Sequence, residues 1–192
     1  MIGVYDFCGH YEWTFGWLGR QGGEELVAAY WDQAIYRDSQ THARELIAGQ
    51  GFAGMREYWG HTLTEEGASW VITSQETVFR IDMHECPSKG FLLRNRLEQY
   101  SDYCNHCIGW VGQLLDEAGF KVDHEHNHRG QCWWEIRKAT DPSPPSPPGG
   151  LLHEGDARHL PDWDNGETPV DSFLTADRTA VPDIEAAHDG NA

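Results

Sequence analysis

The chain has 192 residues and a mass of 21.8 kDa, which favours one compact domain, or one domain with an appendage, and excludes a multidomain machine. No stretch approaches the roughly 20 consecutive apolar residues that a membrane-spanning helix needs, and no basic, apolar leader opens the chain, so we expect a cytoplasmic protein. A net charge of −17 disfavours contact with phosphate backbones and anionic lipids, so we expect neither nucleic acid nor a membrane as a partner.

Apolar side chains recur every three or four positions in the first third of the chain, which is the spacing of amphipathic helices. Glycines at positions 19, 22 and 23 are expected to divide the first of these runs. The predicted helical runs are 8–37, 43–48 and 51–63.

The middle of the chain changes from strand-like to helical composition. Residues 68–73 and 76–84 are rich in β-branched and aromatic residues, which predicts two strands. Helical spacing returns over residues 91–118 and stops at Gly119, which predicts one long helix.

Two final strand-like segments, 120–128 and 131–137, flank Arg129 and Gly130, and this spacing predicts a tight two-residue hairpin. We therefore expect an α+β fold in which N-terminal helices pack on a small antiparallel sheet and one long helix precedes the final β-hairpin. Five large aromatic residues of this body are expected to lie mainly in its core: Trp59, Trp70, Trp110, Trp133 and Trp134.

Residues 141–192 differ in composition from the rest of the chain. They hold 11 of the 31 acidic residues, two of the 14 basic ones and eight of the nine prolines. The run DPSPPSPPGG at 141–150 favours an extended, polyproline-like conformation. We predict a folded domain over 1–140 and a proline-rich linker with an acidic, disordered tail over 141–192, with docking of Val170, Phe173 and Leu174 as the alternative.

Four of the five cysteines fall where a small fold can bring them together. Cys104 and Cys107 form a CxxC pair on neighbouring points of a predicted helix, Cys86 ends a predicted strand, and Cys132 begins the last one. Clustered cytosolic thiols of this kind are typical of metal sites or redox centres. Buried free cysteines that act as small apolar residues are the alternative.

Three histidines at every second position, His124, His126 and His128, would project from one face of a strand and resemble a set of metal ligands. If Arg129 and Gly130 form the turn, His124 faces Glu135, which adds a carboxylate to the histidine face. The alternative is a solvated polar edge.

The end of the second predicted strand brings an acid, an imidazole and a thiol together at Asp82, His84 and Cys86. His84 and Glu85 point to opposite faces of a regular strand, so only one of them can share a site with the other histidines.

Five runs of residues carry a resemblance to a known family: DFCGH at 6–10, YWGHTL at 58–63, RIDMHECPSKGFLLRN at 80–95, YCNHCIGW at 103–110 and DHEHNHRGQCWWE at 123–135. Together they resemble the L-2-amino-thiazoline-4-carboxylic acid hydrolases. This resemblance implies a ring-opening activity, in which a cyclic isothiourea is hydrolysed to N-carbamoyl-cysteine.

A more distant resemblance is to the four-vinyl-reductase type of small-molecule-binding domain, on Cys86-Pro87, a helix cysteine, and a hairpin pair. His128 stands where that family has the first hairpin cysteine, and Cys132 matches the second. The resemblance implies a ligand sensor with a Cys/His metal site.

The leading hypothesis is a metal-dependent hydrolase that acts on a carbon–nitrogen or carbon–sulfur bond of a small cyclic amidine-like acid, with activated water attacking the carbon between nitrogen and sulfur. Zinc or another divalent transition metal is the expected cofactor, and a homo-oligomer is left open. The residues expected to transfer protons are His84, His106, His126 and Glu135. The expected metal ligands are Cys86, Cys104, Cys107, His128 and Cys132.

Two alternatives belong to other classes of protein. One is a non-enzymatic domain that senses or stores a small hydrophobic or tetrapyrrole-like ligand, with zinc bracing the fold. The other is a redox protein that uses Cys104 and Cys107 as a dithiol.

Overall fold

The computed structural model describes residues 4–97, 100–127, 129–150, 155–161 and 163. Its elements, in chain order, are α1 (Val4–Tyr30), the π-helix η1 (Trp31–Ser39), α2 (Thr41–Gln50), α3 (Phe52–Glu65), β1 (Ser69–Ser74), β2 (Val78–Glu85), α4 (Pro87–Asn95), α5 (Asn105–Glu117), β3 (Phe120–His126), β4 (Cys132–Lys138) and the 3-10 turn η2 (Ala157–His159).

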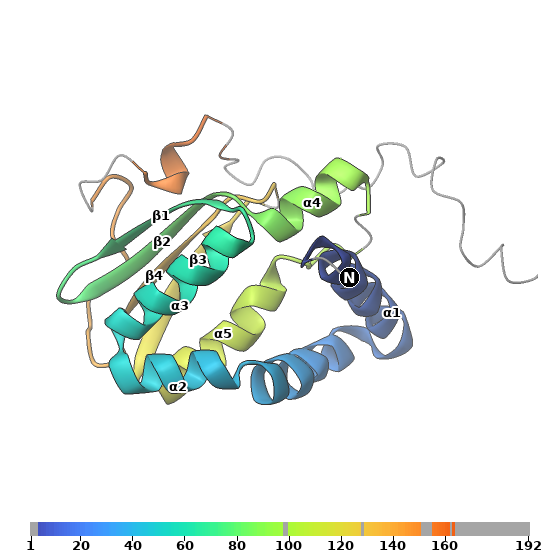
Figure 1. Cartoon of the computed structure of the whole chain (residues 1–192), viewed down its shortest axis with the longest axis horizontal. Helices are drawn as coiled ribbons and strands as arrows, with labels where there is room; N and C mark the ends of the chain where they lie inside the picture. The colour runs from blue at the N-terminus through green and yellow to red at the C-terminus, as the bar shows by residue number, and fades with distance from the viewer. Residues whose placement is uncertain (1–3, 98–99, 128, 151–154, 162, 164–192) are drawn as a thin grey trace, which may run out of the picture.

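The four strands form one antiparallel sheet in the order β1-β2-β4-β3, so the last hairpin places β4 beside β2 and leaves β3 at an edge. The helices α2, α3 and α5 pack together with this sheet (Figure 1). The predicted α+β class is confirmed. Among the described residues, no helix is long and apolar enough to cross a membrane.

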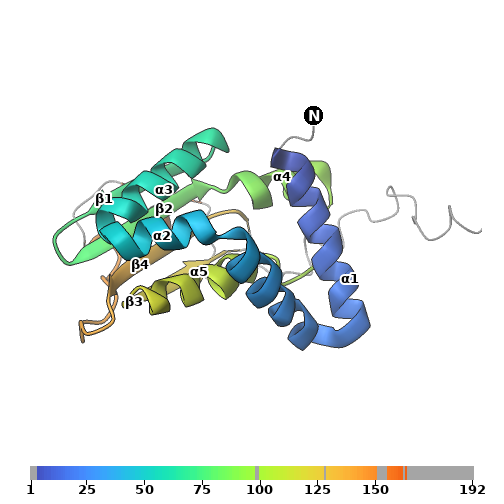
Figure 2. The same cartoon turned by 60° about the horizontal axis from the view of Figure 1, so that its bottom comes forward.

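The long N-terminal helix is divided where the glycines predicted it. Gly22 and Gly23 leave helical geometry, and Gly23 has a φ of 68°, which a glycine adopts without the clash that a Cβ atom would cause. Gly19, by contrast, stays within the helix. The bend turns the chain so that α1 lies beside α4, on the side of the molecule away from the sheet (Figure 2).

The single helix predicted over 91–118 is wrong, because the structure has two helices there. Pro87 opens α4 at its first helical position, and α4 ends at Asn95, followed by Arg96 with a left-handed φ of 56°. The apolar residues between the helices, such as Leu97 and Tyr100, pack against α1. Their helical spacing therefore reflected burial and not a continuous helix.

Two hydrophobic cores hold the layers together. The larger core lies between the inner face of the sheet and the helices α2, α3 and α5, and contains Phe79, Trp134 and Leu115. The smaller one joins α1 and η1 to α4 around Phe15 and Leu92, both fully buried. Of the five tryptophans predicted for the core, three are buried and two are partly buried: Trp59, Trp133 and Trp134, and then Trp70 and Trp110.

The outer face of the sheet is covered by a C-terminal strap, defined as residues 141–150 and 155–161. Within it, Asp156 and Ala157 are buried, and Ala157 N–H donates to Asp82 Oδ1 at 2.9 Å. Residues 155–161, which the sequence analysis assigned to a disordered tail, are therefore part of the folded body. The predicted docking residues Val170, Phe173 and Leu174 lie outside the described residues.

Candidate functional site

The register of the final hairpin differs by one residue from the predicted register. His126 pairs with Cys132, His124 with Trp134, and Asp123 with Glu135. The connection is longer than a two-residue turn, because Asn127 Oδ1 accepts hydrogen bonds from the backbone N–H groups of residues 129 and 131, at 3.0 and 3.2 Å. A slip of one residue exchanges the two faces of a strand.

This register separates the predicted proton-transfer residues. His124 and His126 lie on the inner face, with ring centroids 5.4 Å apart. Glu135 lies on the outer face, where Arg80 Nη1 donates to Glu135 Oε2 at 3.2 Å. His84 also faces outward and bonds through Nε2 to the carbonyl of Gly155 at 2.6 Å. The expected pairing of a carboxylate with the histidine face is therefore wrong.

The four predicted cysteines lie near one another, at the end of the sheet where β2, β4, α4 and α5 come together. Cys86 is the N-cap of α4, Cys104 is the N-cap of α5, Cys107 lies in the first turn of α5, and Cys132 begins β4. The pKa of Cys107 is raised first by burial and then by Cys86, Cys132 and Cys104. We call these four residues the thiol cluster.

The thiols of this cluster are held in the protonated form. Burial raises the pKa of Cys104 to about 12, and burial also raises the pKa values of the other three. Two of the sulfur atoms accept hydrogen bonds: Lys89 N–H donates to Cys86 Sγ at 3.4 Å, and Trp134 Nε1 donates to Cys132 Sγ at 3.3 Å. Buried thiols without a strong positive partner are poor nucleophiles until a base removes the proton.

Lys89 supplies a buried basic group beside the cluster. Only 1% of this residue is exposed, and burial lowers its pKa, while Cys104 and Glu12 oppose that shift. Its Nζ lies 6.0 Å from the centroid of the Tyr103 ring. The Tyr103 hydroxyl in turn shares a 2.5 Å hydrogen bond with Ser88 Oγ.

His106 and Cys107 are in hydrogen-bond contact with each other. His106 Nδ1 lies 2.5 Å from the carbonyl oxygen of Tyr103. Because a carbonyl oxygen only accepts, Nδ1 carries the proton, and Nε2 presents its lone pair to Cys107 Sγ at 3.5 Å. Burial lowers the pKa of His106 to about 4, so the imidazole is neutral at neutral pH. The pair has the arrangement of a nucleophile, a base and a group that orients the base.

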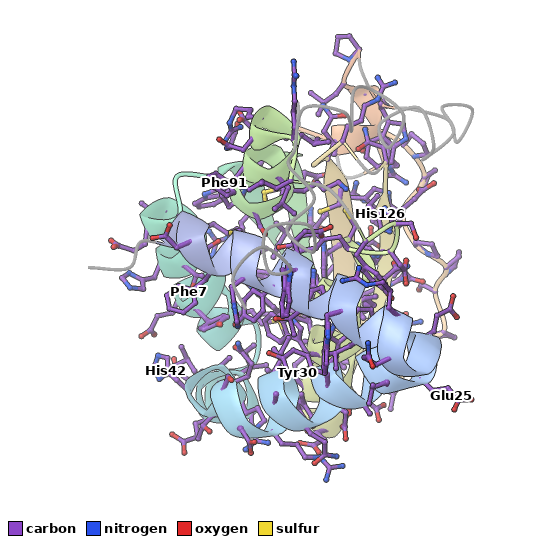
Figure 3. All side chains as sticks on the ribbon, turned by 90° about the vertical axis from the view of Figure 1, so that its right-hand side faces the viewer. Phe7, Glu25, Tyr30, His42, Phe91 and His126 are labelled. Atoms are coloured by element: carbon purple, nitrogen blue, oxygen red, sulfur yellow. The ribbon has the colours of Figure 1, made fainter. Side chains whose placement is uncertain are left out.

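A second imidazole reaches the same turn of α5. His126 Nε2 lies 3.0 Å from Asn105 Oδ1, and Asn105 Nδ2 donates to Asp102 Oδ1. Figure 3 labels His126 near the end of the sheet, beyond α1 in that view. The segment from Asp102 to Cys107 therefore carries His106 and contacts His126.

The fit of a metal ion can be tested on these groups. A structural or catalytic zinc site needs three or four ligands around one point. Within the part of the chain that the structure describes, no three His, Cys, Asp or Glu side chains are placed so that they could hold one ion. His128, one of the expected ligands, lies outside that part. The thiol cluster as arranged does not fit a metal, and the zinc expectation stays a prediction.

No known protein family, curated protein or solved structure matches the chain. The resemblance to L-2-amino-thiazoline-4-carboxylic acid hydrolases therefore stays a prediction, and function is argued from the geometry of the site.

Sequence reasoning missed the roles of Asp102, Asn105 and Tyr103. They lie within and beside the CxxC motif: Asn105 donates to Asp102, and the backbone carbonyl of Tyr103 accepts from His106. The partner that only the fold brings close is His126, which bonds to Asn105. The polar residues around Cys104 and Cys107 were the available signal.

Proposed function

We propose that the protein is a hydrolase of small cyclic amidines that uses Cys107 as a nucleophile and His106 as its base. The observation that carries this proposal is the 3.5 Å contact between Cys107 Sγ and His106 Nε2, in an imidazole whose other nitrogen donates to the Tyr103 carbonyl. This assignment replaces the metal- or Glu-activated water of the sequence-based hypothesis.

A neutral thiol–imidazole pair suits a substrate that contains its own base. In a 2-amino-thiazoline, the electrophilic carbon lies between sulfur and a basic ring nitrogen. His106 can take the Cys107 proton and pass it to that nitrogen as the carbon–sulfur bond to Cys107 forms, so no separated charge accumulates in the buried site. An ordinary amide lacks such a basic nitrogen.

The reaction then proceeds in two balanced stages. In the first, the ring carbon–sulfur bond breaks, and the ring sulfur leaves as a thiol after taking a proton. In the second, water adds to the carbon held by Cys107, the carbon–sulfur bond to Cys107 breaks, and the Cys107 thiol recovers its proton. The net change is addition of one water and formation of a ureido group. His126, held by Asn105, is the second imidazole available to activate that water.

The test uses 2-amino-thiazoline-4-carboxylate as the probe, with the ureido product measured by mass spectrometry. We expect turnover by the full chain, a covalent adduct on Cys107 under single-turnover conditions, and loss of turnover by at least about 100-fold in Cys107→Ser and His106→Gln. Cys8→Ser is the matched control, since Cys8 is a buried thiol of α1 that the proposed reaction does not use. Full turnover by a folded Cys107→Ala variant would overturn the assignment.

A second candidate function is a binding domain without turnover. It is favoured by one observation, the raised pKa values of all four clustered thiols, which describe an unreactive resting state. Binding of the probe without product or adduct, or a ligand that copurifies with the chain, would support this candidate. Elemental analysis of protein purified without a metal-affinity tag tests the zinc prediction in the same preparation.

A further inference from the structure

We propose that Asp102 and Asn105 are positioning residues that hold His126 as its Nε2–H tautomer, with Nδ1 as the nitrogen that carries the lone pair. Neither residue is needed to explain the pairing of Cys107 with His106. The effect on reaction rate rests on the proposed function, whereas the tautomer itself does not.

The direction of each hydrogen bond follows from the chemistry of the groups. The carboxylate of Asp102 only accepts, so Asn105 must turn its NH2 group toward Asp102. The amide oxygen of Asn105 then faces His126 Nε2 at 3.0 Å, and because that oxygen only accepts, Nε2 must carry the proton. A charge two groups away thus fixes which nitrogen of His126 is protonated.

The same turn fixes the opposite tautomer in its neighbour. His106 is protonated at Nδ1 by its bond to the Tyr103 carbonyl, whereas His126 is protonated at Nε2 by its bond to Asn105. The short segment 102–106 therefore holds two imidazoles, those of His106 and His126, in opposite tautomers at one end of the sheet. His126 belongs to this end, since it pairs across the strands with Cys132 of the thiol cluster.

The hydrogen bond between Asn105 and Asp102 is favoured by its surroundings. Asp102 and Asn105 are partly buried; Asn105 is the first residue of α5, and Asp102 precedes it by three positions. In its carboxylate form, Asp102 acts only as an acceptor. A hydrogen bond to an ionised group is also stronger than one between neutral groups.

Isosteric variants test the proposal without altering side-chain size. In Asp102→Asn, residue 102 can either donate to or accept from Asn105, so the chain of bonds loses its direction. We expect His126 to populate both tautomers, and its Nε2–H proton to exchange with water about tenfold faster, as expected for loss of roughly one hydrogen bond. The double variant Asp102→Asn/Asn105→Asp restores an acceptor beside His126, so the wild-type tautomer should return.

The measurement is a long-range nitrogen–proton correlation spectrum of the full chain with labelled histidine, at neutral pH. His126→Gln assigns the signals of His126, and His106 is the internal reference, because a backbone carbonyl sets its tautomer in every variant. An Nδ1–H tautomer in the wild type, an unchanged spectrum in Asp102→Asn, or a double variant that fails to restore the Nε2–H signal would each overturn the proposal.

The rate of ring opening provides a separate result. If the tautomer changes in Asp102→Asn and kcat falls with it while KM is kept, His126 acts in the reaction as proposed. If the tautomer changes and the rate does not, the positioning role stands and the assignment of His126 to water activation fails.

Discussion

The inner face of the sheet, covered by helices, and the outer face, covered by the strap, both bury polar side chains, yet they keep them in different charge states. On the inner face, burial holds the thiols protonated and lowers the pKa values of His106 and His124 to about 4. On the outer face, Arg80 is fully buried and surrounded by the carboxylates of Asp82, Glu135 and Asp156.

Compensating charge explains the difference. Burial alone would lower the pKa of Arg80, but the three carboxylates raise it instead. Burial likewise opposes ionisation of Asp156, yet Arg158 and Arg80 lower its pKa. Trp133 also stabilises both arginines, since the guanidinium carbons of Arg80 and Arg158 lie 4.8 and 4.7 Å from its ring centroid. Neutral groups suit proton transfer, whereas paired ions suit attachment of the strap.

The largest expected effect comes from breaking the ion network of the outer face. Arg80→Met leaves three buried carboxylates without their shared partner, so we expect the free energy of unfolding to fall by about 3–5 kcal/mol in urea denaturation. Arg94→Met is the control, because Arg94 pairs with Glu85 on the exposed surface and should change stability by less than about 1 kcal/mol. Equal effects of the two substitutions would contradict this account of the outer face.

The sequence predicted the α+β class because periodicity records which side of each element is buried. The placement of Cys86, Cys104, Cys107 and Cys132 near one another followed from the expectation that their elements are neighbours, and their role as metal ligands stays a prediction. It did not predict the hairpin register, because the side chain of Asn127 replaces backbone groups within the turn. Alternation alone cannot detect that change.

The outer network was also beyond prediction. Arg80 and Asp156 are separated by 76 positions in the chain, and Asp156 lies in a segment whose composition indicated disorder. Its burial depends on specific donors, since Arg80 in β2 and Arg158 in the strap supply the charge that makes burial of the Asp156 carboxylate favourable. The amino-acid composition of a segment does not show which of its residues will form an individual ion pair of this kind.

The second prediction concerns the histidines of the inner face. An unfolded imidazole takes up a proton near pH 6.5, but folded His106 does so only near pH 4. Its contribution is therefore complete above about pH 6.5 and is lost as the pH falls toward 4. We expect His106→Gln to flatten the pH dependence of the unfolding free energy in this window, by about 2 kcal/mol between its ends.

Denaturation curves at several pH values measure this effect. The exposed His61 of α3 provides the control, and His61→Gln should leave the slope between pH 4 and 6.5 as it is in the wild type. If His106→Gln keeps that slope too, then His106 is not the group that links stability to pH on the inner face.

The third prediction gives the outer face a different pH window. The pKa of Asp156 is lowered by its arginine partners and backbone donors despite burial, so its contribution is present above the ordinary carboxyl pKa near 4 and is lost as the pH falls further. In Asp156→Asn, the loss of stability below about pH 4 should become shallower by about 1–2 kcal/mol. Above pH 4.5, the pH dependence of the unfolding free energy should be the same in Asp156→Asn as in the wild type. If the substitution changed the pH dependence only above pH 4.5, the outer face would not have a pH window of its own.

The smallest expected effect tests whether the strap can loosen without disturbing the inner face. His84 Nε2 bonds to the carbonyl of Gly155 at 2.6 Å, and this is one hydrogen bond among several that hold the strap. His84→Ala should therefore lower stability by about 1 kcal/mol. The effect should be local: amide exchange at Ala157, whose N–H donates to Asp82, should accelerate about fivefold, while exchange in α5 keeps its wild-type rate.

Since His84 faces away from the thiol cluster, turnover of the amidine probe should also be unchanged. Loss of turnover in a folded His84→Ala protein, with normal exchange at Ala157, would mean that the outer face takes part in the chemistry and that the division between the two faces is wrong.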